Sequence, residues 1–319
     1  MRSNLFLRIV SALILAPIVL CPIWFGKSVY EEYGIPLYPI LLVTLGTGLA
    51  WEWGEMFQKK GSANQLMMAL TAGLVAFMSI SNPTFGLWLI LLGTTLIAAQ
   101  TQAARVLVAV VYFYMPLLAV QFESSVPLLI AELILFFLSI LMCLGSKQLK
   151  FALGVPYICL PILALGYIYY INENISREIV LWLIFVVWAT DVGGFVVGKT
   201  VGGPKLAPKI SAKKTWSGLI GAILFAMAVA YVFALYLKAH GIIVEESYLT
   251  RLVLSAGVLA VIAQVGDFFE SAIKRKLGLK DSSNLIPGHG GLFDRVDGLL
   301  FASMATALVL AMINNGWFM

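Results

Sequence analysis

Charged residues are scarce in this sequence. Only 12% of the 319 residues are Asp, Glu, Lys or Arg, and 61% are hydrophobic. Soluble proteins typically have about 25% charged residues, so this composition excludes an ordinary soluble domain. Alternating strands of about ten residues are also missing, which excludes a transmembrane β-barrel. The chain instead has apolar runs of about 18 residues or more, which predict an all-α, polytopic membrane protein.

Cysteine is rare as well. The three cysteines, Cys21, Cys143 and Cys159, fall inside apolar runs and have no metal-site or redox spacing, so we predict no disulfide. The amino-terminal run begins with basic residues, as a signal peptide does, but lacks a small-x-small cleavage site. We therefore interpret it as a retained first helix. Because internal repeats and low-complexity segments are absent, we expect one integral-membrane domain, with amino-terminal helices over 1–150 and a catalytic half over 151–319.

Breaks between the apolar runs predict a transmembrane helical bundle of about nine to eleven spans. Their limits fall near residues 5–25, 37–57, 65–81, 84–101, 103–121, 126–145, 151–171, 178–198, 216–237, 252–273 and 298–316. If the amino terminus is cytoplasmic, 17 of the 21 Lys and Arg residues lie on inner segments, and only Lys27, Arg177, Lys238 and Arg251 lie outside. This bias predicts a cytoplasmic amino terminus.

The first of two strongly basic inner segments follows Asp191, which we place inside a span about two turns from its cytoplasmic end, where a carboxylate needs a partner. Gly and Pro residues keep this segment out of helix until about Trp216. A flexible basic loop that ends at a helix start suits phosphate binding, although the Walker A spacing is missing. For Gly194 and Gly198, helix packing is the main interpretation. The predicted substrate-binding residues here are Asp191, Lys199, Ser211, Lys213, Lys214 and Thr215.

The second inner segment places acidic and basic residues together beside the membrane. The spacing of Asp267, Glu270, Ser271 and Lys274 at i, i+3, i+4 and i+7 predicts one polar helix face. Asp294 and Asp297 would share a face of a last helix that starts near Phe293. Two helix ends meeting here would bring Asp267, Asp294 and Asp297 together as oxygen ligands, which Mg²⁺ prefers. The alternative is that these acids only pair with neighbouring Lys and Arg residues.

The segment from Ser271 to Asp297 reads S-x-x-K-R-x4-K-D-x5-P-x-H-G-G-x-x-D-R-x-D and resembles the signature of the phosphatidate cytidylyltransferases, or CDP-diacylglycerol synthases. Other motifs of that family are similar to three further parts of the chain. These are the segment from Trp188 to Lys199, the segment K-L-A-P-x-I-S-x-K-K-T-W-x-G that begins at Lys205, and the Trp51-Glu52 pair. Two positions depart: Ala212 stands where the family usually has Pro, and Ser217 where it has Glu. The loss of that glutamate puts its role in the nucleotide or metal site in doubt.

The resemblance implies that CTP and phosphatidate react to CDP-diacylglycerol and pyrophosphate with Mg²⁺, a second cation being left open. It implies an enzyme of the bacterial inner membrane with a cytoplasm-facing active site, and it favours a homodimer with no nucleic-acid partner. The expected catalytic residues are Asp267, Lys274, Arg275, Lys280, Asp281, His289, Asp294, Arg295 and Asp297. Substrate binding adds Glu52 and Ser271, and the expected metal ligands are Asp267, Asp294 and Asp297. His289 either hydrogen-bonds its own turn or touches the nucleotide.

Two other functions compete with this one. The first is a related membrane enzyme, either a CTP-dependent kinase or a cytidylyltransferase for another lipid. The second is a transporter or channel, because acids among apolar helices are also typical of ion pathways. Transporter sites usually lie near the membrane midplane, whereas these acids cluster at the predicted cytoplasmic ends.

The predicted topology is testable by one-sided labelling of single cysteines in a cysteine-free background. Cysteines replacing Lys209 and Ser283 should react with an impermeant reagent only from the cytoplasmic side, because both lie on basic inner segments. A cysteine replacing Glu245 should react only from outside. Labelling of Lys209→Cys and Glu245→Cys from the same side would overturn the predicted order of spans.

Overall fold

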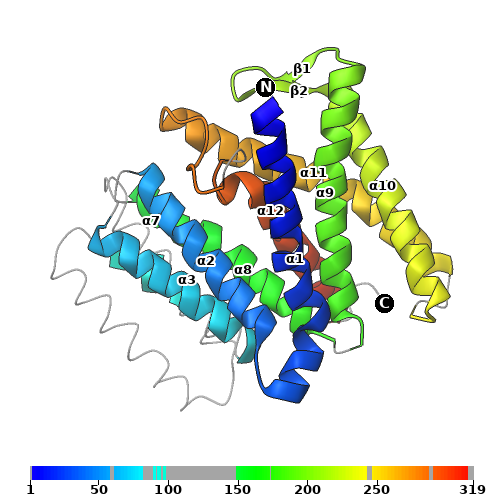
Figure 1. Ribbon diagram of the computed structural model, residues 1–319, viewed down its shortest axis with the longest axis horizontal. Coiled ribbons are helices and arrows are strands. Elements are labelled where there is room, and N and C mark those ends of the chain that lie inside the picture. Colours follow the sequence, from blue (N-terminus) through cyan, green and yellow to red (C-terminus); the bar gives the residue numbers. More distant parts are fainter. Residues whose placement is uncertain are drawn as a thin grey trace. The chain divides into compact units, whose positions relative to one another are not determined.

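The computed structural model describes residues 2–57, 61–81, 89–90, 92–94, 96–97, 149–172, 174–242, 246–286 and 290–314. These residues are mainly helical (Figure 1). The helices are α1 (Arg2–Tyr33), α2 (Leu37–Met56), α3 (Ala63–Ser81), α7 (Leu149–Ala152), α8 (Gly154–Tyr170), α9 (Ser176–Thr200), α10 (Trp216–Ala239), α11 (Glu246–Lys276) and α12 (Phe293–Asn314). One hairpin, made of β1 (Lys205–Ala207) and β2 (Ser211–Thr215), connects α9 to α10.

Six helices in the described part of the chain are long and apolar enough to cross a membrane. This result confirms the all-α, polytopic fold. The spans predicted near 103–121 and 126–145, and most of the span near 84–101, fall outside the described residues. The first helix is longer than predicted, because the polar residues after Phe25 do not break it. It ends where Gly34 takes a φ of 69° and donates its N–H to the Tyr30 carbonyl at 2.8 Å.

The chain divides into two compact units, one comprising residues 1–38 and 164–319 and the other residues 39–163. The first helix thus belongs to the same unit as α9 to α12. The expectation of one integral-membrane domain, with amino-terminal helices over 1–150 and a catalytic half over 151–319, stays a prediction. In the 39–163 unit, Trp53 Nε1 donates to the Phe151 carbonyl at 2.9 Å and fixes α2 against α7. Glu52 lies beside it on α2 and is buried.

Helices α9 and α10 of the larger unit pack closely through glycine. The carbonyl of Gly194 would lie only 2.9 Å from a Cβ added to Gly218, and the Cα of Gly218 would lie 3.3 Å from a Cβ added to Gly198. Small residues at such contacts let two helix backbones approach. The predicted packing role of Gly194 and Gly198 is confirmed.

A second close crossing joins α11 to α12. A Cβ added to Gly266 would lie 2.6 Å from the carbonyl oxygen of Asp297, and one added to Gly298 would lie 3.2 Å from that of Ala263. Gly266 directly precedes Asp267, and Gly298 directly follows Asp297. The glycine crossing therefore determines where these two carboxylate-bearing turns meet.

The basic segment after α9 is a β-hairpin, although the sequence suggested only a flexible loop. The strands are antiparallel and pair Lys205 with Thr215 and Ala207 with Ser211. Thr215 also caps α10, since its Oγ1 accepts the Gly218 N–H at 3.1 Å. Helix α10 begins at Trp216, as predicted. Ser217, which replaces the family's usual glutamate, donates its hydroxyl to the Gly202 carbonyl and holds the base of the hairpin.

The α11–α12 crossing gives a stability prediction. Gly266→Ala should lower the free energy of unfolding by about 1–3 kcal/mol, because the new methyl group meets a backbone carbonyl that cannot turn away. Gly257→Ala on the same helix is the matched control: its Cβ would lie 3.2 Å from the flexible Met227 Sδ. Thermal unfolding of the two purified variants in one detergent checks the difference, and equal melting temperatures would contradict the crossing.

Candidate active site

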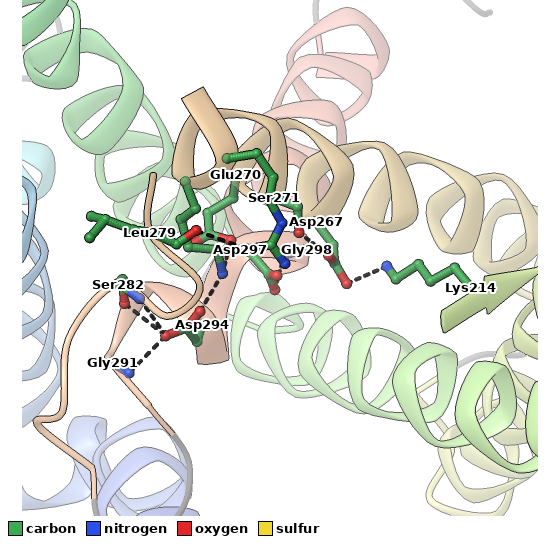
Figure 2. A network of polar contacts seen from close by, with 12 residues as sticks. Lys214, Asp267, Glu270, Ser271, Leu279, Ser282, Gly291, Asp294, Asp297 and Gly298 are labelled. Carbon is green, nitrogen blue, oxygen red and sulfur yellow. Dashed lines mark hydrogen bonds and ion pairs between the residues drawn. The ribbon is translucent and has the colours of Figure 1, made fainter. Parts of the chain in front are cut away.

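Several of the charged residues singled out in the sequence come together from α11, α12 and strand β2 of the larger unit (Figure 2), and Asp191 on α9 interacts electrostatically with three of them. They form two groups, each built around one lysine. In the first group Lys214 meets Asp267, and in the second Lys274 meets Glu270 and Asp294. Both groups share α11, which carries Asp267, Glu270 and Lys274 on one face, as their spacing predicted.

In the first group, Lys214 reaches from the hairpin to α11. Its Nζ forms an ion pair with Asp267 Oδ2 and lies 4.8 Å from the centroid of the Phe268 ring. Ser271, one turn further along α11, donates its hydroxyl to Asp267 Oδ1 at 3.3 Å. The Lys214 and Asp267 side chains remain 22% and 21% exposed, so a ligand can still reach this pair.

Two further carboxylates lie near Asp267. Asp191 on α9 is exposed and interacts electrostatically with Asp267, Lys214 and Arg295. Asp297 on α12 accepts the N–H of Gly298 at 2.7 Å and interacts electrostatically with Asp267 and Asp191. Three helices thus bring three carboxylates together beside two cationic side chains. Carboxylate oxygens gathered in this way are the ligand type that a hard cation such as Mg²⁺ takes.

In the second group, Lys274 is buried and its ammonium lies between two carboxylates. Its Nζ is 2.5 Å from Glu270 Oε2 and also pairs with Asp294 Oδ1. The other oxygen of Asp294 accepts the backbone N–H of Ser282 at 2.9 Å, the Ser282 hydroxyl at 2.9 Å and the Gly291 N–H at 2.8 Å. Figure 2 shows these donors converging on Asp294 from the loop that joins α11 to α12.

The predicted ligand set of Asp267, Asp294 and Asp297 is therefore not assembled in this structure. A carboxylate has about four lone-pair sites, and protein donors already make four contacts to Asp294. Over the described ranges, no three acidic, histidine or cysteine side chains form a group that could hold a metal ion. Asp267 and Asp297 still fit Mg²⁺ chemically, because this ion needs only one or two carboxylates and takes its other ligands from water and substrate phosphates.

Several other predicted residues lie at the surface around this centre. Lys213 on β2, Lys280 and Asp281 in the α11–α12 loop, and Arg295 on α12 are exposed. Lys199 lies in the last turn of α9, with its Nζ 5.5 Å from the centroid of the Phe195 ring.

For two of the remaining predicted site residues, the structure shows contacts outside the group of carboxylates. Arg275 donates to the Leu279 carbonyl at 2.8 Å and closes the end of α11. Ser211 pairs with Ala207 in the hairpin. Glu52 belongs to the other compact unit, and His289 lies outside the described residues, so their proposed roles stay predictions.

Sequence reasoning missed four residues that build the site. Gly266 and Gly298 set the helix crossing, whereas Ser282 and Gly291 bind Asp294. A signal for the first two was present, since each glycine is adjacent to an aspartate on an apolar helix. The sequence held no signal for the contacts of Ser282 and Gly291 with Asp294. The direction of a backbone N–H group in a loop depends on the folded conformation of that loop, which no local sequence pattern predicts.

A separate hollow between α1, α9 and α10 is apolar and aromatic. Trp24, Phe185 and Phe233 are among its lining residues. It contains none of the predicted site residues, so the charged centre and not this hollow defines the candidate active site.

The fold and the site together define an integral membrane protein with an acidic and basic centre on its long apolar helices. The model of the Cytidylyltransferase family matches residues 6–313, and the chain belongs to that family. A phosphatidate cytidylyltransferase of Haemophilus influenzae is 30% identical over 309 residues, covering 92% of this chain and 94% of the relative. One of Rickettsia bellii is 39% identical over 173 residues, covering 53% of this chain and 71% of the relative.

Proposed function

We propose that this protein transfers the cytidylyl group of CTP to phosphatidate, giving CDP-diacylglycerol and pyrophosphate. The observation that carries this proposal is the meeting of Asp191, Asp267 and Asp297 with Lys214, on helices of membrane length. Such a centre suits a reaction between two phosphate-bearing substrates, one of them held in the bilayer. The full-length similarity to a phosphatidate cytidylyltransferase supports the same reaction.

The chemistry asks for alignment and charge neutralisation more than for a strong base. The second pKa of a phosphate monoester is about 6, so phosphatidate is largely dianionic near neutral pH. One of its oxygens forms a bond to the α-phosphorus of CTP, and the bond from that phosphorus to the α–β bridging oxygen breaks. The pyrophosphate leaves with the electron pair. Phosphoryl-transfer sites accelerate such steps mainly by positioning and electrostatic stabilisation.

Two sets of residues serve these needs: the carboxylates form a cation site, and the basic residues Lys213, Lys214 and Arg295 lie around it. Asp267 and Asp297, with Asp191 beside them, would hold Mg²⁺, which would supply positive charge to the phosphate oxygens. Lys214 keeps Asp267 oriented, and its own charge adds to that of the site. We expect Lys213 and Arg295, both exposed, to contact the triphosphate.

The positive-inside bias supports a cytoplasm-facing site in a bacterial inner membrane. CTP then enters from the cytoplasm, and phosphatidate arrives laterally with its acyl chains in the bilayer. A homodimer is part of the same proposal through the family resemblance.

The direct test is incubation of the purified protein with α-³²P-labelled CTP, Mg²⁺ and phosphatidate vesicles. The proposal expects label in the lipid phase together with one pyrophosphate per labelled lipid. Label that stays in the aqueous phase as CDP, with an unlabelled phospholipid product, would instead indicate a CTP-dependent lipid kinase.

Replacement of Asp267 tests the cation site. Asp267→Asn should abolish turnover, because a neutral amide neither binds Mg²⁺ strongly nor pairs with Lys214. Gel filtration and melting temperature should show an intact folded protein, since the residue is partly exposed. Near-normal activity of this variant at saturating Mg²⁺ would remove Asp267 from the proposed ligands.

The hairpin lysines should differ in their kinetic effects. Lys213→Ala should raise KM for CTP more than KM for phosphatidate, with a loss of about 1.5–3 kcal/mol, or roughly ten- to a hundredfold in kcat/KM. Lys214→Ala should in addition lower kcat, because Asp267 loses its ion-pair partner. Lys209→Ala at the hairpin turn is the matched control and should have a smaller effect. A defect confined to phosphatidate dependence would assign the hairpin to the lipid head group.

A further inference from the structure

The group around Lys274 has a feature that the proposed reaction does not use. Glu270 is only 2% exposed, yet it is a carboxylate on an apolar helix. Its Oε2 lies 2.5 Å from Lys274 Nζ, and no hydrogen-bond donor in the described part of the chain reaches Oε1. A buried charge of this kind is costly unless it is paired, so Glu270 depends on Lys274.

Lys274 in turn depends on Glu270 and Asp294 to balance its buried charge. It is 6% exposed, and its ammonium faces Glu270 and Asp294 at once. Two carboxylates already balance its charge, and little of the side chain can meet a ligand. This environment does not suit direct contact with a substrate phosphate, although the sequence analysis placed Lys274 among the expected catalytic residues.

Asp294 connects the Glu270–Lys274 pair to the loop between α11 and α12. Its second oxygen binds Ser282 and Gly291, which lie near the two ends of the loop segment that follows Lys280. The loop closes further where Ile286 N–H donates to the Gly290 carbonyl at 2.8 Å. A continuous chain of contacts therefore runs from Glu270 through Lys274 and Asp294 to both ends of this loop (Figure 2).

We propose that Glu270 and Lys274 are positioning residues, which hold Asp294 and thereby fix loop residues 280–286 and 290–291 in place for the nucleotide. The loop carries the exposed Lys280 and leads into Arg295, so its position determines where these two charges meet the triphosphate. The link to the nucleotide rests on the proposed function. The link to the loop does not, and it can be measured without substrate.

The test uses an Ile286→Cys substitution at a buried position, in a protein whose Cys21, Cys143 and Cys159 are replaced by serine. The reaction of the introduced thiol with a maleimide in detergent reports opening of the loop. Lys274→Met should speed labelling about tenfold or more, and the isosteric Glu270→Gln about two- to fivefold, since each loosens Asp294. Lys276→Gln, an exposed neighbour on the last turn of α11, should leave the rate unchanged.

The double variant Glu270→Gln/Lys274→Met gives the sharpest result. Lys274→Met leaves the buried Glu270 and the partly buried Asp294 without their lysine, whereas the double variant leaves only Asp294. If the two residues act as one unit, the double variant labels more slowly than Lys274→Met alone and recovers part of the lost affinity for CTP. The proposal would be overturned if the two single substitutions raised the labelling rate independently, so that the double variant showed the product of their two increases. It would also be overturned if the Glu270→Gln protein were labelled at the parent rate.

The kinetic readout separates this proposal from the proposed function. Lys274→Met should raise KM for CTP more than KM for phosphatidate, because the loop and not the lipid site is displaced. An unchanged labelling rate at position 286 with a large rise in KM for CTP would instead make Lys274 a direct phosphate ligand. If the parent protein transfers no cytidylyl group, the proposed function fails, and the labelling rates still decide the role of Glu270 and Lys274.

Discussion

Carboxylates on apolar helices have to be neutralised within the protein, and the larger unit is organised around this requirement. Two lysines meet it. Lys214 joins the hairpin to Asp267 on α11, and Lys274 joins α11 to Asp294 on α12. Helix α10 lies between Lys214 and Asp267 in the sequence, and the α11–α12 loop lies between Lys274 and Asp294. The same contacts therefore join separate segments of the fold and place the charged groups of the site.

Glycine supplies the second part of the arrangement. At the α11–α12 crossing, Gly266 and Gly298 let the two backbones approach and set the turns that bear Asp267 and Asp297. At the α9–α10 crossing, Gly194 and Gly218 do the same beside the hairpin that carries Lys214. Helices in a membrane gain little from the hydrophobic effect against one another, so close backbone contact matters more there than in a soluble core. The site depends on these crossings as much as on its charged side chains.

The sequence predicted most of the described helices, the start of α10 at Trp216 and that of α12 near Phe293, because apolar periodicity and Gly/Pro breaks are local signals. It also placed Asp267, Glu270 and Lys274 on one face of a helix. It could not predict which acid meets which lysine, since Lys214–Asp267 and Lys274–Asp294 are tertiary contacts. For the same reason, the predicted grouping of Asp294 with Asp267 and Asp297 gave way to a contact with Ser282 and Gly291.

The proposed cation lies between Asp267 and Asp297, and anomalous diffraction from crystals grown with Mn²⁺ and a non-hydrolysable CTP analogue can locate it. Mg²⁺ sites have metal–oxygen distances of about 2.0–2.1 Å, and Mn²⁺ prefers the same oxygen ligands. We expect an anomalous peak that contacts Asp267 and Asp297 together with phosphate oxygens, while Asp294 keeps its contacts to Lys274 and the loop. A peak that lies away from both Asp267 and Asp297, or one ligated by Glu270 in place of Lys274, would contradict it.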